Sequence, residues 1–292
     1  GLGDMKDYKI LWLDCKEGIV KNKRIWIMIP VVLLYSMLTH IELDIIWENI
    51  APEYGPYSLF ELFWINFSGC DPLIKAKAMT IPYPWLAMYI CPVFMTFDYM
   101  QQDLLGYGSQ MLFRIGSRKR WWYQKCIWCF ISALWIYLLM WITMAVFCLI
   151  NHIPVSFTPN PNTIAFMATE SICYTPVSNT LIPSPSFTMT LLVCPLLSMF
   201  TMELLTMALT LFVRPAIAFI INVGILTLSI TFDWTLLFPR IGMLMKNDLL
   251  YSDAYSLKKG IILCISFITV CMIGGGIVFR YKDILPGKEE EP

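Results

Sequence analysis

Four acidic residues lie inside long apolar stretches of this sequence and are its first candidates for chemistry: Asp98, Asp103, Glu203 and Asp233. Charged groups are costly inside a membrane, so acids placed there are rare and usually functional. One interpretation is a proton or cation relay. The other is structural, in which the acids pair with cations or reach headgroup water. The candidate partners of Asp98 and Asp103 are Arg114, Arg118, Lys125 and Arg214.

Glu203 is the hardest of these acids to explain. Its nearest basic residue within the same apolar stretch is Arg214, about three helical turns away. Both interpretations therefore stay open for Glu203. Trp128, Trp135 and Trp141 recur at about seven residues, which keeps them near one helix face. With Glu203 they are candidates for lining a substrate pathway, although anchoring at the membrane interface is the simpler role for tryptophan.

Ten cysteines offer two further candidate sites. Cys126 and Cys129 form a C-x-x-C pair, which suggests a redox or metal pair, or else two small residues of a membrane helix. The structural interpretation is favoured, because no second cysteine pair and no neighbouring histidine completes a metal site. Cys70 and Cys173 fall in two long loops and are candidates for a disulfide, which geometry has to decide.

The sequence lacks the common catalytic motifs. It has no G-x-x-x-x-G-K-[ST] loop, no H-E-x-x-H and no G-x-S-x-G, and its two histidines are isolated. We therefore predict that the chain is not itself an enzyme and binds no cofactor or metal of its own.

Composition indicates where these residues are placed. The chain is 58% hydrophobic and only 14% charged, whereas soluble domains carry about 25% charged residues. This predicts an all-α integral membrane protein. The net charge of zero gives no electrostatic case for nucleic-acid binding. Gly1–Asp4, ahead of Met5, are interpreted as a cloning remnant, and no secretory signal peptide is recognised.

Apolar runs predict six transmembrane helices within a membrane domain of residues 25–283, at 25–41, 84–105, 121–150, 187–213, 215–234 and 260–279. An extension toward Trp47 is the alternative end of the first span. The stretch 187–238 is far too long for one crossing, and Arg214-Pro215 is its strongest break, so we expect two spans joined by a tight turn. Gly274-Gly275-Gly276 permits close helix contact. Residues 5–24 alternate charge with an apolar stripe and predict an interfacial amphipathic (elbow) helix; a soluble helical leader is the alternative.

The segments between the spans set the orientation. Outer loops are expected at 42–82, 151–186 and 239–259; the first should form an ordered aromatic cap, and Ile241–Met245 a short re-entrant or interfacial helix. Fifteen of the 21 Lys and Arg fall on one side: in the leader, in the basic turn up to and including Lys125, at Arg214 and in the C-terminal end from Arg280 onward. The positive-inside rule then places both termini, including the tail 284–292, in the cytoplasm.

The 106–120 turn and the residues after it carry a basic cluster: Arg114, Arg118, Lys119, Arg120 and Lys125. Its amphipathic core is Tyr107–Ile115, where four apolar residues fall at helical spacing: Tyr107, Met111, Leu112 and Ile115. A basic loop with such a segment is typical of a cytoplasmic interfacial helix.

The layout resembles the ABC-2 type permease subunits of bacterial ABC exporters. The resemblance rests on the amphipathic leader, the six spans, the basic turn Asp103–Lys125, the tight turn after the fourth span and the ending Phe279-Arg-Tyr-Lys-Asp-Ile-Leu. It covers nearly the whole chain in layout, and its sequence motifs are confined to that turn and that ending. In detail the chain is similar to permeases of small-peptide exporters, including the phenol-soluble modulin type. The long first outer loop departs from the family pattern.

The resemblance implies a bacterial cytoplasmic membrane location and a pathway built with a second permease copy or homologue, in the lipid bilayer. Two separate ABC ATPase subunits would bind ATP and Mg²⁺ and dock on the cytoplasmic side. The turn would be the coupling helix, with its contacts made by Tyr107, Gln110, Met111, Phe113, Arg114 and Arg118. The exported substrate would be amphipathic or hydrophobic, with a peptide favoured.

Three other function classes compete with this interpretation. A secondary transporter or channel would depend on Glu203 and would survive ATP depletion. A membrane-embedded enzyme lacks a nucleophile or metal set. An immunity or assembly subunit would bind partners without driving flux.

Overall fold

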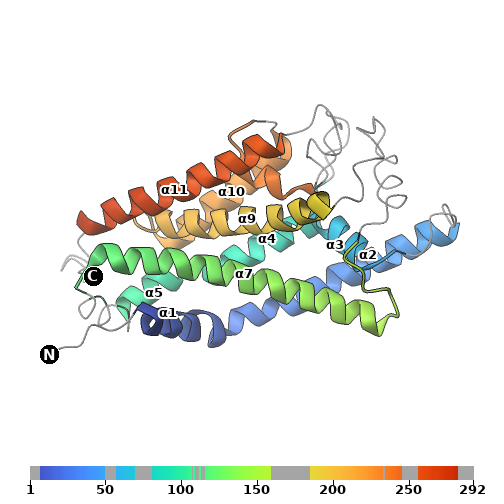
Figure 1. Ribbon diagram of the computed structural model, residues 1–292, viewed down its shortest axis with the longest axis horizontal. Coiled ribbons are helices and arrows are strands. Elements are labelled where there is room, and N and C mark those ends of the chain that lie inside the picture. The colour runs from blue at the N-terminus through green and yellow to red at the C-terminus, as the bar shows by residue number, and fades with distance from the viewer. Residues whose placement is uncertain are drawn as a thin grey trace, which may run out of the picture.

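The computed structural model describes residues 7–49, 57–69, 81–106, 108, 112, 116–158, 185–232, 234–244 and 256–281. Every regular element in these ranges is a helix (Figure 1). The longer helices are α2 (Met28–Asn49), α4 (Tyr83–Thr96), α7 (Arg118–Ile150), α9 (Pro185–Leu209), α10 (Pro215–Thr231) and α11 (Leu257–Tyr281). The shorter ones are α1 (Asp7–Cys15), η1 (Lys16–Val20), η2 (Lys23–Ile27), α3 (Leu59–Phe67), α5 (Tyr99–Leu105) and η4 (Phe238–Gly242).

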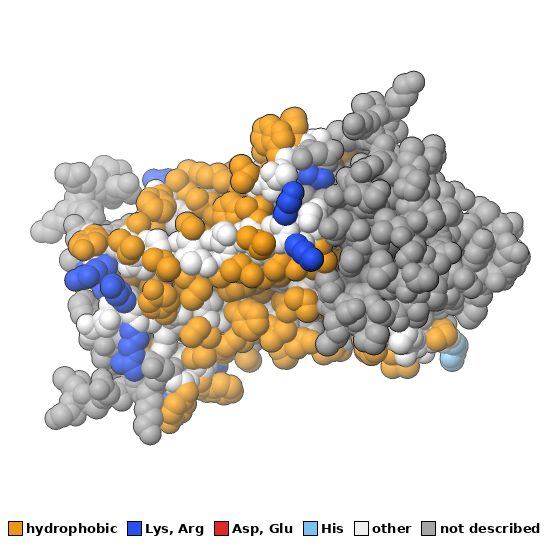
Figure 2. Space-filling view, turned by 45° about the horizontal axis from the view of Figure 1, so that its top comes forward, with side chains coloured by type: hydrophobic (Ala, Val, Ile, Leu, Met, Phe, Trp, Pro, Cys, Tyr) orange, Lys and Arg blue, Asp and Glu red, His pale blue; other side chains and the backbone are white. Residues whose placement is uncertain are grey.

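Four helical stretches in the described ranges are long and apolar enough to cross a membrane: Lys23–Ile45, Arg118–Ile150, Leu192–Leu209 and Leu257–Tyr281. Helix α7 alone has 33 residues, about 50 Å at 1.5 Å per residue, more than the ~30 Å hydrocarbon core. Figure 2 shows a band of hydrophobic side chains with Lys and Arg toward its two ends. The chain is a multi-pass membrane protein; the fifth apolar helix, α10, is shorter than these four.

The predicted span 84–105 is wrong as one continuous helix. It is divided into α4 and α5 by a turn at Phe97–Asp98. The physical reason lies in the leader: Asn22 Nδ2 donates to the Met95 carbonyl at 2.9 Å, an acceptor that Tyr99 N would use in an unbroken helix. The side chain of Asp98, at the break, is engaged by two donors from other residues.

The leader is helical as expected, but it is not one helix over 5–24. It runs as α1 and the π-helical η1, turns at Lys21–Asn22 and enters the membrane through the 3₁₀ helix η2. Gly18 fixes this path, because a Cβ there would lie 2.7 Å from atoms of both Tyr99 and Trp128. On its apolar stripe, Ile10 and Ile19 are buried, while Tyr8 and Val20 remain exposed.

The tight turn at Arg214-Pro215 is confirmed. Helix α9 ends at Leu209, and α10 begins at Pro215 with Arg214 as its N-cap. Proline is suited to this first helical position, where its missing N–H costs no intrahelical bond.

The expected outer loop 42–82 is corrected in its described parts. Residues 42–49 continue α2, in line with the alternative end of the first span toward Trp47. Helix α3 packs against α2, α4 and α7 (Figure 1). Phe60, Phe63 and Phe67 are 0% exposed, and Phe63 stacks on Trp141 at 4.3 Å. Eight of the nine residues of α3 are buried, Glu61 and Asn66 among them, so α3 is part of the core rather than a surface cap.

A second short helix enters the same half of the bundle. The short helix expected at Ile241–Met245 begins three residues earlier, as η4, which is buried throughout; its re-entrant or interfacial placement stays a prediction. Trp85 Nε1 donates to the Gly242 carbonyl at 3.0 Å, and Tyr89 OH donates to it at 3.3 Å. Met245 lies outside the described residues.

The segments that the charge pattern assigns to one side do gather at one end of the bundle. The leader, α5, the start of α7 and the end of α11 lie together there (Figure 1). Trp121 of α7 stacks on Phe279 of α11 at 4.9 Å. Thr210, just after α9, contacts Met100 of α5.

Close contact at the glycine triplet is also confirmed, and it yields a prediction. A Cβ on Gly275 would overlap the buried Trp122 ring, whereas one on Gly274 would meet no described atom within 4 Å. We expect Gly275→Ala to destabilise the protein by about 1–3 kcal/mol through overpacking. Gly274→Ala is the matched control and should stabilise by up to ~1 kcal/mol through helix propensity. Thermal unfolding in detergent measures both; equal effects would contradict this packing.

Candidate functional site

Three helices meet at a buried ion cluster formed by Asp14, Asp103 and Lys125. Lys125 of α7 is 1% exposed, and its Nζ lies 2.5 Å from Asp14 Oδ1 of α1 and 2.8 Å from Asp103 Oδ2 of α5. The rings of Tyr99 and Trp121 each lie 5.0 Å from the ammonium. One cation therefore binds the leader and the end of α5 to the start of α7.

The cluster holds two carboxylates against a single ammonium. Burial raises the pKa of Asp14 above its ordinary value, and Lys125 opposes this shift. Tyr99 OH donates to the backbone carbonyl and to Oδ1 of Asp14, each at 3.3 Å. The charge of Lys125 is thus the main feature that keeps the carboxylates in place.

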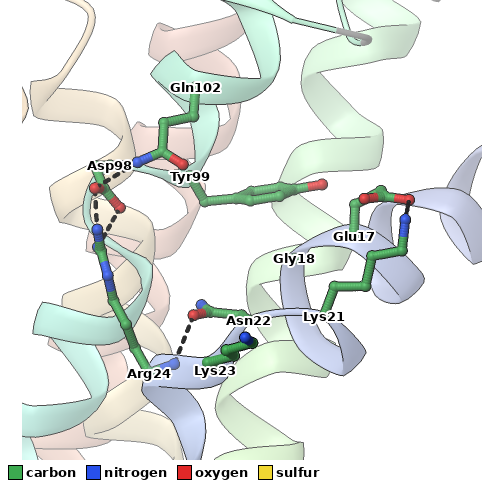
Figure 3. A pocket seen from close by; sticks show the side chains of 9 residues that line it. All are labelled: Glu17, Gly18, Lys21, Asn22, Lys23, Arg24, Asp98, Tyr99 and Gln102. Atoms are coloured by element: carbon green, nitrogen blue, oxygen red, sulfur yellow. Dashed lines mark hydrogen bonds and ion pairs between the residues drawn. The ribbon is translucent and has the colours of Figure 1, made fainter.

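A second ion pair lies beside the first. Arg24 Nη1 is 2.9 Å from both carboxylate oxygens of Asp98, and Gln102 Nε2 donates to Oδ2 at 2.7 Å. These residues border a half-open hollow of about 300 Å³ between the leader and α5 (Figure 3). The Lys21–Glu17 pair, 2.6 Å apart, stands on the far side of the hollow.

The two acids at the end of the predicted second span are therefore paired. Asp103 pairs with Lys125, one of the expected partners, whereas Asp98 pairs with Arg24, which the sequence did not suggest. Asp14 was also missed. Its signal is its position on the apolar stripe, four residues after Ile10, where a lone polar side chain has to find a buried partner.

Most of the expected coupling residues lie outside the described residues: Tyr107, Gln110, Met111, Phe113 and Arg114. Arg118 opens α7, directly after the N-cap Ser117, and its Nη1 donates to the Arg280 carbonyl at 3.2 Å. Gly108 lies so close to Asp103 that a Cβ would overlap its carboxylate. The described ends of the turn are thus fixed to the ion cluster and to α11.

Glu203 lies inside the bundle beside Ser132, which is about two helical turns along α7 from Lys125. It is 2% exposed, and neither carboxyl oxygen has a hydrogen-bond partner among the described residues. Ser132 of α7 lies alongside, but its hydroxyl also falls short of hydrogen-bond geometry. Asn222 of α10 donates to the carbonyl of Met202, the residue before Glu203, at 2.7 Å. No described ion pair compensates a charge on Glu203.

The remaining candidate residues, the three tryptophans and the cysteines, do not form one common site among the described residues. Trp128 stacks on Tyr99 at 4.0 Å and Trp141 on Phe63, whereas Trp135 is 45% exposed. The three tryptophans therefore do not occupy one environment, and their role in a pathway stays a prediction. Cys126 and Cys129 are buried free thiols. Cys70 and Cys173 lie outside the described residues.

Comparison with known proteins gives one match. A family model described as "Protein of unknown function (DUF2705)" matches residues 60–285, a range that begins in α3 and extends past α11. No curated protein and no solved structure matches the chain.

Proposed function

The chain belongs to the DUF2705 family of proteins of unknown function, and we propose that it is the transmembrane permease subunit of an ATP-driven exporter of the ABC-2 type. In this proposal it crosses the bacterial cytoplasmic membrane six times with both termini in the cytoplasm. Separate ATPase subunits hydrolyse ATP, and a second permease copy or homologue completes the pathway.

The observation that carries the proposal is the buried Lys125. It connects the leader, the helix before the basic turn and the helix after it through ion pairs of 2.5 and 2.8 Å. A turn that only joined two spans would not need its ends fixed to the leader. A turn that is displaced by a partner subunit needs such a rigid attachment, because contacts between packed or bonded elements carry its displacement to the neighbouring helices.

The mechanism follows from this attachment. Closure of the ATPase pair on ATP would displace the 106–117 segment. Lys125 and Asp103 would pass this displacement to α5 and α7, and Asp14 would make the leader move with them. Rigid-body movement of such helices against each other is a common way to switch a pathway between inner and outer access.

The exposed helix faces fit the rest of the assembly. Large apolar side chains are exposed on α2, α10 and α11, among them Leu34, Ile220 and Ile262. These faces suit acyl chains or a second permease copy. An apolar pathway formed between copies would suit an amphipathic or hydrophobic substrate, and a peptide is our preferred class.

The test is co-purification with the ATPases encoded beside this chain. We expect a stable complex with ATPase activity, and we expect Arg114→Glu with Arg118→Glu to lower ATPase retention about tenfold through like-charge contact. Retention in detergent and ATP hydrolysis measure this outcome.

The matched control reverses two cations at the other end of the bundle. Lys258→Glu with Lys259→Glu alters exposed residues at the start of α11 and should leave ATPase retention unchanged. Loss of retention in both variants, or no ATPase partner for the unmodified chain, would refute the proposal. Thermal unfolding of each variant separates lost docking from lost folding.

A second candidate function rests on Glu203. A buried carboxyl without a described hydrogen-bond partner is typical of proton relays in secondary transporters. In that case flux would follow an ion gradient, would not require ATP and would be lost in Glu203→Gln. The same residue replaced in an ATP-driven permease would leave export running.

A further inference from the structure

The hollow in Figure 3 lies where the leader turns into the membrane. Its lower wall is the turn into η2, with Asn22, Lys23 and Arg24, and Tyr99 and Gln102 of α5 stand opposite. Gly18 closes one side and presents no side chain to it. The hollow therefore sits at the turn between the leader and the first candidate membrane span, Lys23–Ile45.

Of the three cations that border the hollow, Lys21 and Arg24 form ion pairs with described residues and Lys23 does not. Lys21 pairs with Glu17, and Arg24 pairs with Asp98. Lys23 is exposed, and its side chain has no partner among the described residues. The lining therefore carries a net charge of one positive unit, which matches a single phosphodiester anion.

Apolar side chains border the same turn. Val20, Trp26 and Ile27 are 69%, 55% and 46% exposed, directly before and after the lining residues. Exposed apolar side chains beside a cation at a helix entry are suited to acyl chains below a headgroup. A soluble anion would make no use of them.

We propose that this hollow binds the headgroup of an anionic phospholipid, with Lys23 at the phosphodiester and Val20, Trp26 and Ile27 against the acyl chains. Arg24 adds a second donor, because only its Nη1 is taken up by Asp98. The bound lipid would fix the angle between leader and α2. The proposal does not depend on the ATPase assignment, so it stands or falls separately.

The experiment is lipid titration of the full chain in detergent, read by native mass spectrometry with phosphatidylglycerol and phosphatidylcholine. We expect the unmodified chain to bind one phosphatidylglycerol more tightly than phosphatidylcholine. Lys23→Gln should weaken phosphatidylglycerol binding about fivefold, the effect of one juxtamembrane cation. Lys23→Arg should retain binding.

Lys16→Gln is the matched control, since Lys16 is an exposed leader cation that does not line the hollow. It should change the affinity by less than about twofold. Equal weakening by Lys16→Gln and Lys23→Gln, or equal binding of the two lipids, would overturn the site. Displacement of phosphatidylglycerol by an equal concentration of glycerol phosphate would assign the hollow to a soluble phosphate and would also overturn the lipid proposal.

Discussion

Replacing Lys125 by methionine should destabilise the protein by roughly 3–5 kcal/mol, the cost of leaving a buried charge uncompensated. Met fills a similar volume, so lost packing contributes little. Asp14 and Asp103 would then face each other across an apolar site between Tyr99 and Trp121 without their cation. We expect the leader to detach from α7 and to become accessible to protease. Unfolding in detergent and limited proteolysis of the leader measure the effect.

A charge series separates electrostatics from packing at this cluster. Adding Asp14→Asn and Asp103→Asn to Lys125→Met removes all three charges and should recover most of the lost stability, because neutral replacement of a buried ionic cluster is often tolerated. Asp14→Asn alone leaves Lys125 paired with Asp103 and should cost less than Lys125→Met. If the triple variant were as unstable as the single one, the cluster would act through shape rather than charge.

The Lys125→Met variant should also depend on pH. Burial raises the pKa of Asp14, and Lys125 is the group that opposes the rise, so removal of Lys125 should raise this pKa further. An acid with a raised folded-state pKa binds its proton more tightly in the folded protein, and stability is lost as pH rises through that value. The variant should therefore recover stability on acidification toward the ordinary Asp pKa, about 3.9. A deficit that stays the same at every pH from 8 down to about 4, the ordinary Asp pKa, would contradict this.

The sequence predicts a helix and its ends well where residues close together in the chain determine them. The 33-residue α7 and the break at Arg214-Pro215 follow from apolar length and from proline. The gathering of basic segments at one end follows from the charge pattern. In each case the determining residues are neighbours in the chain.

What the sequence does not predict depends on contacts between distant residues. The Asp98 partner is 74 positions away and the Asp14 partner 111 positions away. The interruption between α4 and α5 coincides with the Asn22 contact, and within residues 84–105 only Pro92 and the polar Asp98 hint at it. Burial of α3 was detectable in principle, since Leu59–Phe67 is apolar except for Glu61 and Asn66, but its Pro- and Gly-containing surroundings suggested a loop.

Glu203 offers the clearest test of whether transport by this chain would be driven by ATP or by an ion gradient. A carboxylate there would be buried with no described cation and no hydrogen bond, at a cost of several kcal/mol, so we expect the side chain to be held as a neutral acid. Glu203→Gln keeps shape and neutrality and should change the free energy of unfolding by less than about 1 kcal/mol. Glu203→Lys introduces an uncompensated charge at the same place and should cost roughly 3–5 kcal/mol.

The transport result of Glu203→Gln then decides between the two candidate functions. An ATP-driven permease should retain ATP-dependent export in this variant, because the amide preserves the packing against Ser132 and no proton is needed in the cycle. A proton-coupled transporter should lose flux while remaining folded, because an amide cannot carry the proton. Flux into vesicles, measured with ATP and then with a pH gradient alone, distinguishes these outcomes. Export that survives without ATP and disappears in Glu203→Gln would replace the permease proposal with the secondary transporter.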